Sequence, residues 1–329
     1  MSALWRTCAL RLLVAAGLVA AAAQSAAARP ADTITYLLPA PKEAIVFAPF
    51  VLAQIQGKYR AANLDVHFVV VPGGFNVGKA LARGEGDLGG ASGDTPILLR
   101  AADAPVKGIA LLGAHSFLTL VTRKDRVADD GTLSGKRIDV PSFKDTSYYA
   151  LQEIEGGYPQ GALPIQSEAR SSADLIAALG EGKIDGFVGT VDWGVKAERA
   201  GAQLAYRELD DFYPAMAQAI IASDHAIDTK SKALKRFVRA TLAQLGRIAR
   251  DPEGSATLYE RAVPDSGYSH AEVVRIFRLL GREVYGDTRR PGKFDRKVVV
   301  QAEAELLERG LIAQRRPAAD YYTNRFAGG

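Results

Sequence analysis

The sequence alternates between short apolar runs that are typical of strands and amphipathic segments that are typical of helices. In the first part of the chain, strand-like runs cover residues 33–38, 64–71, 106–112 and 118–122, and a helix-like segment covers 47–59. The runs at 106–112 and 118–122 are continuously apolar and rich in branched side chains, which favours buried strands. Strands that alternate with helices in this way predict an α/β fold.

A second block with the same rhythm begins near Gly131 and runs to about Ile221. The two blocks share the pattern A-L-x-x-G-x-x-D, at residues 80–87 and again at 178–185. We interpret each copy as the end of an amphipathic helix, a glycine in the left-handed conformation and a turn into a strand. A chain of 329 residues is typical of about two domains, and the shared pattern favours two similar lobes.

The last part of the chain is helical in pattern. Apolar side chains recur at helical spacing along 234–249 and again along 273–280, and a third helix is predicted over 294–309. Such stripes are typical either of packing against a core or of a partner-binding surface, and we expect core packing. The lobes are therefore expected to carry extra C-terminal helices.

The N-terminus has the three parts of a secretory signal peptide. Arg6 and Arg11 precede an apolar run over 12–23, and the alanines at 26–28 form a small-residue cleavage pattern. The alternative is a membrane anchor, but the run is well short of the roughly 20 residues that span a bilayer. We therefore expect residues 1–28 to be removed on export.

Charge and composition exclude several classes of function. The chain has 41 basic and 37 acidic residues spread along its length, so neither a nucleic-acid-binding face nor a polybasic membrane surface is expected. The only cysteine, Cys8, lies in the predicted signal peptide, which leaves the mature chain without thiol chemistry. There is no P-loop, HExxH or GxSxG motif, and the four histidines are scattered. We expect no metal, no cofactor and no enzymatic activity.

Polar turns stand between predicted strand ends and helix starts. The first is 90–96, where Thr95 is a good N-cap and Pro96 a good first helical residue. The second is 141–147, where Lys144 adds a positive charge. Free amides at helix starts can bind an anion or a polar group, and open α/β sheets bind ligands outside the carboxyl ends of their strands. The alternative is that each turn only caps its helix, and the turn residues alone do not decide.

Two further turns complete the candidate site. The turn at 189–193 contains Trp193, which is either an interlobe core residue or a surface on which a ligand stacks, and the turn at 39–44 precedes Phe47. The candidate ligand-binding residues from the four turns are Lys42, Glu43, Phe47, Ser92, Gly93, Asp94, Thr95, Ser142, Lys144, Thr146, Thr190, Asp192 and Trp193.

Three segments resemble one known family. They read FVLAQIQGKYRAANLDV at 50–66, LARGEGDLGGASGDTP at 81–96 and LSGKRIDVP at 133–141. They are similar to segments of the solute-binding proteins of ABC importers for aliphatic sulfonates, taurine, nitrate and thiamine-pyrimidine precursors. The Gly-Asp-x-Pro part of the second segment is most similar to the sulfonate receptors. The sequence departs from the family at 142–146 and 190–193, where small polar and aromatic or acidic-proline segments are usual.

The resemblance implies a periplasmic, monomeric protein with the two-lobed periplasmic binding protein fold of type II, whose lobes are joined by two crossovers. One lobe would comprise 29–118 and 222–329, and the other 119–221. The protein would close around a small-molecule ligand and deliver it to an ABC permease and its ATPase in the inner membrane. Alternatives are an enzyme on the same fold in pyrimidine metabolism, whose iron-associated cysteine cluster the mature chain lacks, and a periplasmic ligand sensor.

On this reading the candidate residues have different roles. Lys144 and the helix starts at Thr95 and Thr146 would hold a negative group of a sulfonate-like or aromatic acid, and Phe47 and Trp193 would cover its apolar surface. For a heterocycle or an amine, the acceptors would instead be the carboxylates of Asp94, Asp192 and Glu43.

Overall fold

The structure is a computed structural model that describes most of the chain. The described residues are 30–128, 132–141, 146–156, 165–168, 171–209, 213, 216–286 and 292–328. The predicted signal peptide lies outside them. From Thr33 on, the chain forms one compact unit. No helix in the described ranges is both long enough and apolar enough to cross a membrane.

The first sheet combines strands from the start of the chain with one strand from much later. Its strands are β1 Asp32–Leu38, β2 Leu64–Val70, β3 Leu88–Ser92, β4 Val106–Leu111 and β10 Gln218–Ser223. Their order is β2-β1-β3-β10-β4. β1 and β3 are parallel, whereas β10 is antiparallel to both of its neighbours.

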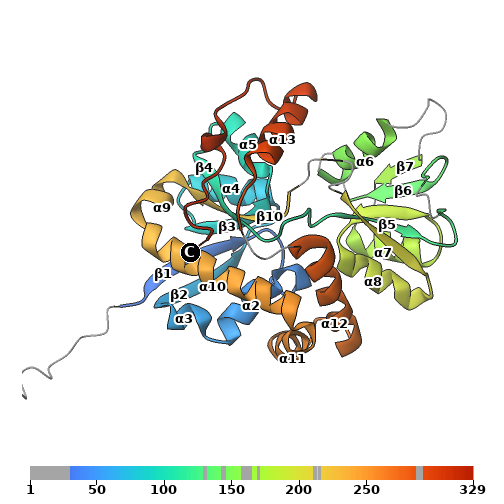
Figure 1. The fold of residues 1–329 in the computed structure, drawn as a ribbon, viewed down its shortest axis with the longest axis horizontal. Helices are drawn as coiled ribbons and strands as arrows, with labels where there is room; N and C mark the ends of the chain where they lie inside the picture. Colours follow the sequence, from blue (N-terminus) through green and yellow to red (C-terminus); the bar gives the residue numbers. More distant parts are fainter. Residues whose placement is uncertain are drawn as a thin grey trace, which may run out of the picture. The chain divides into compact units, whose positions relative to one another are not determined.

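The second sheet is built from the middle of the chain. Its strands are β5 Thr119–Arg123, β6 Arg137–Val140, β7 Ile165–Glu168, β8 Gly186–Gly189 and β9 Leu204–Glu208. Their order is β7-β6-β8-β5-β9, and β5 is antiparallel to both of its neighbours. The chain therefore leaves the first sheet after β4 and returns to it at β10, which confirms the predicted α/β fold with two crossovers (Figure 1). The lobe boundaries after 118 and 221 stay a prediction, and β10 spans the second of them.

The shared A-L-x-x-G-x-x-D pattern has the same local structure in both blocks. Gly84 and Gly182 have φ values of 80° and 71°, so each ends its helix in the left-handed conformation. The Asp87 carboxylate accepts a hydrogen bond from the backbone amide of Thr35 in β1, and the Asp185 carboxylate accepts one from the amide of Arg137 in β6, each at 2.9 Å. The repeated sequence thus joins a helix end to the neighbouring strand in the same way in each sheet.

Helices cover the sheets and continue beyond β10. Those between the strands are α2 Ala48–Ile55, α3 Lys58–Ala61, α4 Gly74–Ala82, α5 Thr95–Ala101, α6 Thr146–Gly156, α7 Ser172–Gly180 and α8 Val191–Ala197. After β10 follow α9 Asp224–Thr229, α10 Ser231–Arg250, α11 Pro252–Ala262, α12 His270–Leu279 and α13 Arg296–Glu308. This last group confirms the expected extra C-terminal helices.

One predicted helix is divided. The segment 47–59 was expected to be continuous, but the structure has a 3₁₀ turn at Ile45–Phe47 and then α2, and a second short helix, α3, follows Gly57. Gly57 has a φ of 65°, in the left-handed region that ends an α-helix. The apolar spacing continued through this glycine, so periodicity alone did not reveal the break.

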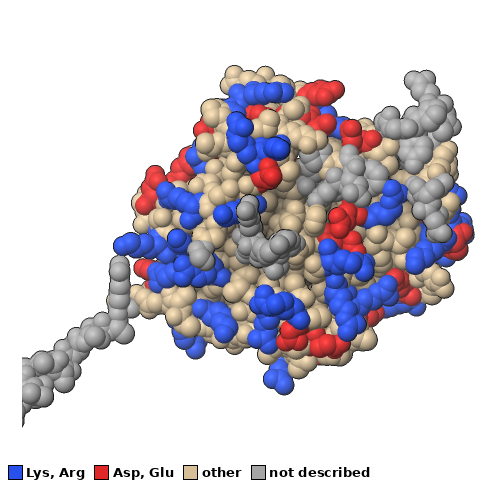
Figure 2. Space-filling model, in the orientation of Figure 1, with Lys and Arg blue, Asp and Glu red and all other residues tan. Residues whose placement is uncertain are grey.

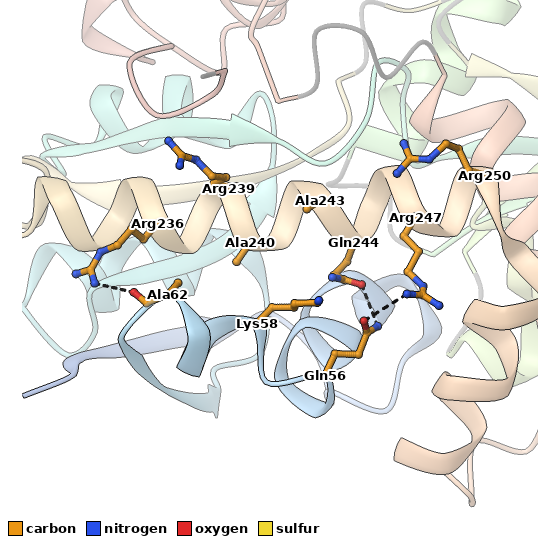
Figure 3. A pocket seen from close by; sticks show the side chains of 10 residues that line it. All are labelled: Gln56, Lys58, Ala62, Arg236, Arg239, Ala240, Ala243, Gln244, Arg247 and Arg250. Carbon is orange, nitrogen blue, oxygen red and sulfur yellow. Dashed lines mark hydrogen bonds between the residues drawn. The ribbon is translucent and has the colours of Figure 1, made fainter. Parts of the chain in front are cut away.

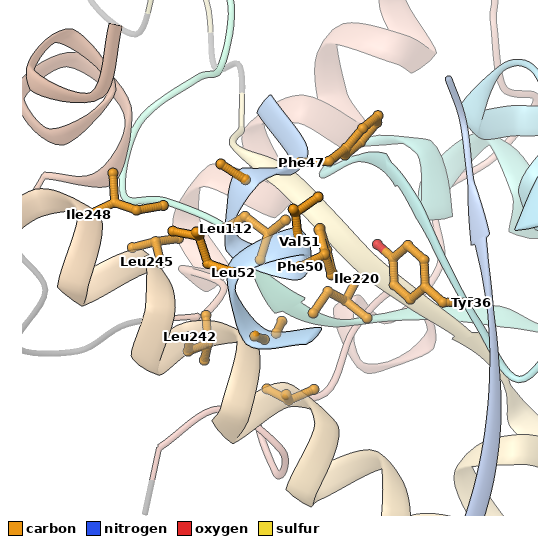
Figure 4. Close-up of a cluster of buried hydrophobic side chains, with 14 of the residues drawn as sticks. Tyr36, Phe47, Phe50, Val51, Leu52, Leu112, Ile220, Leu242, Leu245 and Ile248 are labelled. Carbon is orange, nitrogen blue, oxygen red and sulfur yellow. The ribbon is translucent and has the colours of Figure 1, made fainter. Parts of the chain in front are cut away.

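The largest apolar cluster lies between the first sheet and the helices α2 and α10. In Figure 4, Leu242, Leu245 and Ile248 of α10 face Leu52 of α2, and Ile220 of β10 lies beyond them. Aromatic rings extend this cluster, with Phe237 stacked on the ring of Tyr59 at 4.9 Å between centroids. The apolar stripe of α10 is therefore core, as the sequence predicted, and it fixes the first sheet beneath the candidate site.

Candidate functional site

A cavity of about 820 Å³ lies where the carboxyl ends of β1, β3, β6 and β8 are followed by turns. Its lining includes Pro39 after β1, Ser92 at the end of β3, Pro141 after β6 and Thr190 after β8. The cavity thus receives residues from both sheets, at the strand ends where open α/β sheets bind ligands.

Seven of the thirteen candidate residues line this cavity. Six of them come from three of the four predicted turns, and Phe47 follows the fourth. They are Phe47, Ser92, Asp94, Thr95, Thr146, Thr190 and Trp193. These side chains are far apart in the sequence, and the two sheets bring them to one place.

Two buried hydroxyl groups in the cavity make no hydrogen bond of good geometry within the described part of the protein, although each lies close enough to a neighbouring carboxylate, that of Asp94 or of Asp192, to lower its pKa. They are Ser92 Oγ and Thr190 Oγ1. A buried hydroxyl without a partner costs about 1–3 kcal/mol, so proteins rarely retain one without a reason. The two occupy corresponding places, one at the end of β3 and one after β8. A bound polar group would satisfy both.

Asp94 connects the two halves of the lining. Its carboxylate accepts a hydrogen bond from the Thr146 hydroxyl, with 3.3 Å between Oδ2 and Oγ1. The side chain is buried, and burial raises the pKa of this carboxyl above its ordinary value, while the nearby hydroxyls of Ser92 and Thr146 partly oppose the shift. Asp94 is the only charged side chain among the described residues of the lining.

The start of α5 differs from the prediction by one residue. Thr95 was expected to be the N-cap, but Asp94 occupies that position, and Thr95 and Pro96 lie in the first turn. Pro96 is therefore the second helical residue and not the first, but it still stands where its missing amide costs little. The Asp94 side chain makes no capping hydrogen bond, and its carboxylate is directed to Thr146 instead.

Aromatic and aliphatic side chains form most of the cavity wall. Trp193, in α8, packs near Phe187, with 6.3 Å between ring centroids. Lining residues that were not among the candidates include Phe75, Leu98, Phe117, Tyr149, Gln218, Leu306 and Leu311. Phe75 and Leu311 are exposed, which is unusual for large apolar side chains and was not visible in the sequence pattern.

Four candidate residues do not line the cavity. Lys42 and Glu43 are exposed, and only the backbone carbonyl of Glu43 has a defined role, since it accepts a hydrogen bond from the Tyr259 hydroxyl at 2.7 Å. Gly93 lies between two lining residues and packs against Met216, whose Cβ would lie 2.5 Å from an added side chain. Asp192 is buried in the first turn of α8. The other two candidates, Ser142 and Lys144, lie outside the described residues.

Asp192 belongs to a set of polar contacts that α8 and the 3₁₀ turn Glu198–Ala200 after it make with α12 and the residues just before α12. Its carboxylate accepts a hydrogen bond from the Tyr268 hydroxyl at 3.0 Å. Arg199 donates to Glu272 at 2.7 Å, and Arg275 donates to Glu198 at 2.6 Å. We call these the α8–α12 contacts. They join residues from the predicted second lobe to residues from the predicted first lobe.

The ion pair between Arg199 and Glu272 makes the stability of these contacts depend on pH. Its hydrogen bonds with Arg199 lower the pKa of the Glu272 carboxyl from 4.5 to about 2. The stability that this carboxylate contributes to the folded protein is therefore fully present above pH 4.5 and is lost as the pH falls toward 2.

In the described part of the chain, no group of His, Cys, Asp and Glu side chains could hold a metal ion.

Sequence comparison matches the chain to one protein family. The family is described as NMT1/THI5 like, and the match covers residues 44–255. No curated protein matches the chain at a significant level.

Solved binding proteins have the same fold over nearly the whole chain. The alkanesulfonate-binding protein SsuA from Xanthomonas axonopodis pv. citri, bound to MOPS, is 20% identical, with a TM-score of 0.64 over 91% of this chain and 100% of that one. The ligand-binding component of an ABC-type import system from Staphylococcus aureus, with zinc bound, is 15% identical, with a TM-score of 0.67 over 90% and 97%. The periplasmic nitrate-binding protein NrtA from Synechocystis PCC 6803 is 11% identical, with a TM-score of 0.62 over 89% and 86%.

Proposed function

The chain belongs to the NMT1/THI5-like family, and on that premise we propose that it is the periplasmic substrate-binding component of an ABC importer. It would capture a small organic solute in the cavity, deliver it to a permease and ATPase in the inner membrane, and be exported by its signal peptide. The fold shared with binding proteins of import systems supports this role.

The observation that carries the proposal is a pair of buried hydroxyls, Ser92 Oγ and Thr190 Oγ1, that make no hydrogen bond of good geometry within the described residues. They come from different sheets and line one cavity. A solute that bonds to both would be held by both lobes at once, so binding would favour the form in which the lobes are together.

The size and chemistry of the cavity favour an organic solute. Ligand pockets for drug-sized molecules range from about 300 to 1,000 Å³, and this cavity measures about 820 Å³. A bare oxoanion such as nitrate would leave most of that space empty. We therefore propose a sulfonate-like or aromatic acid, or a heterocycle, whose apolar part packs on Phe47 and Trp193 and whose polar group meets the hydroxyls.

A thermal-shift screen of the mature protein tests the proposed function. The panel comprises alkanesulfonates, taurine, aromatic carboxylates, nitrate and pyrimidines. We expect at least one organic member to stabilise the protein, by about 2.7 kcal/mol at 100 times its dissociation constant, and nitrate to have no effect. Stabilisation by nitrate alone would contradict the organic-solute assignment, and a flat response to every organic member would contradict the binding role for these classes.

From the α8–α12 contacts we expect that the variant Arg199→Ala binds the solute more weakly than the wild type and is nearly as stable. Replacing Arg199 by alanine removes its bonds to Glu272, so we expect the affinity for the solute to fall about threefold to fivefold, the worth of an exposed ion pair. The control is Arg278→Ala, which removes an ion pair with Glu253 at 2.7 Å inside the C-terminal helices. Calorimetry should give the control variant wild-type affinity, and an equal loss in both variants would contradict the role of the contacts in closure.

A further inference from the structure

A second hollow lies along α10, away from the cavity lining. It measures about 610 Å³ and is drawn in Figure 3. Its ten described lining residues include no aspartate and no glutamate. We call it the basic basin, after its cationic members Lys58, Arg236, Arg239, Arg247 and Arg250.

The floor of the basin is formed by small or uncharged side chains. Ala240 and Ala243 lie on α10 between the arginines, and Figure 3 shows that the long basic side chains extend around them. Gly246, one turn before Arg250, contributes to this shape because an added Cβ there would lie 3.1 Å from the Arg250 guanidinium. The Arg250 side chain therefore folds back along the helix toward the basin.

Hydrogen bonds within the basin hold part of its wall in place. Gln56 donates to the side-chain oxygen of Gln244 at 3.1 Å, and Arg247 donates to Gln56 at 3.5 Å (Figure 3). On the other side, Arg236 donates to the carbonyl of Ala62 at 2.7 Å. Two guanidinium groups are thus anchored at opposite ends of the hollow.

The other three cations are not neutralised. Within the described residues, Lys58, Arg239 and Arg250 form no ion pair and no side-chain hydrogen bond. Figure 2 shows that Lys and Arg side chains gather on the face over α10. Positive charges around one concave surface raise the local potential, because their potentials add and no carboxylate in the lining opposes them.

Favourable interactions of arginines with their own helix or with a nearby carboxylate explain the positions of only some of the cations in the basin. Arg247 and Arg250 lie in the last turn of α10, where cations interact favourably with the helix dipole. Arg247 also lies 3.6 Å from the carboxylate of Asp251. Neither reason applies to Arg239, near the middle of α10.

We propose that the basic basin binds a small anion that carries at least two phosphate groups. Guanidinium groups match phosphate oxygens with two parallel hydrogen bonds, and the basin offers several such groups around a concave floor. A single phosphate would engage one cation of the hollow, whereas a diphosphate can contact cations on successive turns of α10. The phosphates could belong to a free ion or to a lipid headgroup.

Calorimetry of the mature protein with inorganic pyrophosphate tests the site. We expect saturable binding, a tenfold or greater loss of affinity in the double variant Arg239→Ala/Arg250→Ala, and weaker binding at higher salt. The matched control is Lys232→Ala/Lys235→Ala, which removes the same charge from exposed positions of α10 outside the lining. We expect the control to bind as the wild type does. Absence of binding by the wild-type protein, or an equal loss in both double variants, would overturn the proposal.

Sedimentation with vesicles distinguishes the source of the phosphate. Vesicles of phosphatidylcholine are compared with vesicles that also contain cardiolipin, which carries two phosphates. Cosedimentation with cardiolipin that the Arg239→Ala/Arg250→Ala variant loses, together with pyrophosphate binding, supports a lipid headgroup, and pyrophosphate binding alone supports a free ion. Vesicle binding without pyrophosphate binding would overturn the small-anion site. Thermal unfolding of each variant checks that it is folded.

Discussion

Replacement of Phe237 by alanine is expected to lower the free energy of unfolding by about 3–5 kcal/mol, the usual cost of removing a buried aromatic ring. The Phe237 side chain is completely buried. Its ring stacks on Tyr59 at 4.9 Å and on Tyr36 at 5.4 Å between centroids. The ring therefore joins α10 to α3 and to β1, and no neighbour can fill its volume without moving the backbone.

Urea unfolding measures this effect. Lys235→Ala is the matched control, since it changes an exposed side chain on the same helix and should alter stability by less than about 0.5 kcal/mol. The two variants should differ in midpoint and share the same slope. A loss below about 1 kcal/mol in Phe237→Ala would mean that α10 does not pack on the first sheet as the structure has it.

Replacement of Trp193 by alanine is expected to weaken solute binding by about 2 kcal/mol, or about 30-fold in Kd. Trp193 lines the cavity from α8, and Gly189 leaves room for its ring, because a Cβ there would lie 2.6 Å from it. The indole is therefore fixed in place before the solute arrives, so little side-chain entropy is lost on binding.

The control for Trp193 is an aromatic residue outside the cavity. Tyr322 stacks on Phe294 at 5.1 Å between centroids and is half-buried. Tyr322→Ala should lower stability and leave the Kd unchanged, whereas Trp193→Ala should change the Kd far more than stability. Calorimetry and unfolding of the two variants separate these effects. Equal Kd values for both variants would remove Trp193 from the proposed site.

Much of the fold could be predicted because its signals are local. The alternation of strands and helices and the repeated A-L-x-x-G-x-x-D pattern depend on short stretches of sequence, and the structure gives both copies the same hydrogen bonds through Asp87 and Asp185. The division of the helix at Gly57 could not be predicted from periodicity, since the apolar spacing continued across it.

The candidate site was harder to predict because its signals are not local. Turns after strands identified Ser92 and Thr190, since any ligand in an open α/β sheet lies near such turns. The same rule selected Lys42 and Glu43, which the fold leaves exposed. Phe75 and Tyr149 were missed because an aromatic residue near the start of a helix gives no sign, in sequence, of whether it packs on a core or faces a cavity.

Calorimetry of the solute selected by the screen, against the wild type and the double variant Ser92→Ala/Thr190→Val, tests the central claim most directly. Both substitutions remove hydroxyls that make no hydrogen bond of good geometry within the described residues, so stability should be nearly preserved. We predict one-to-one binding by the wild type and at least tenfold weaker binding by the variant. Equal affinity would contradict the account, because the solute would then not be held between the two sheets by these groups.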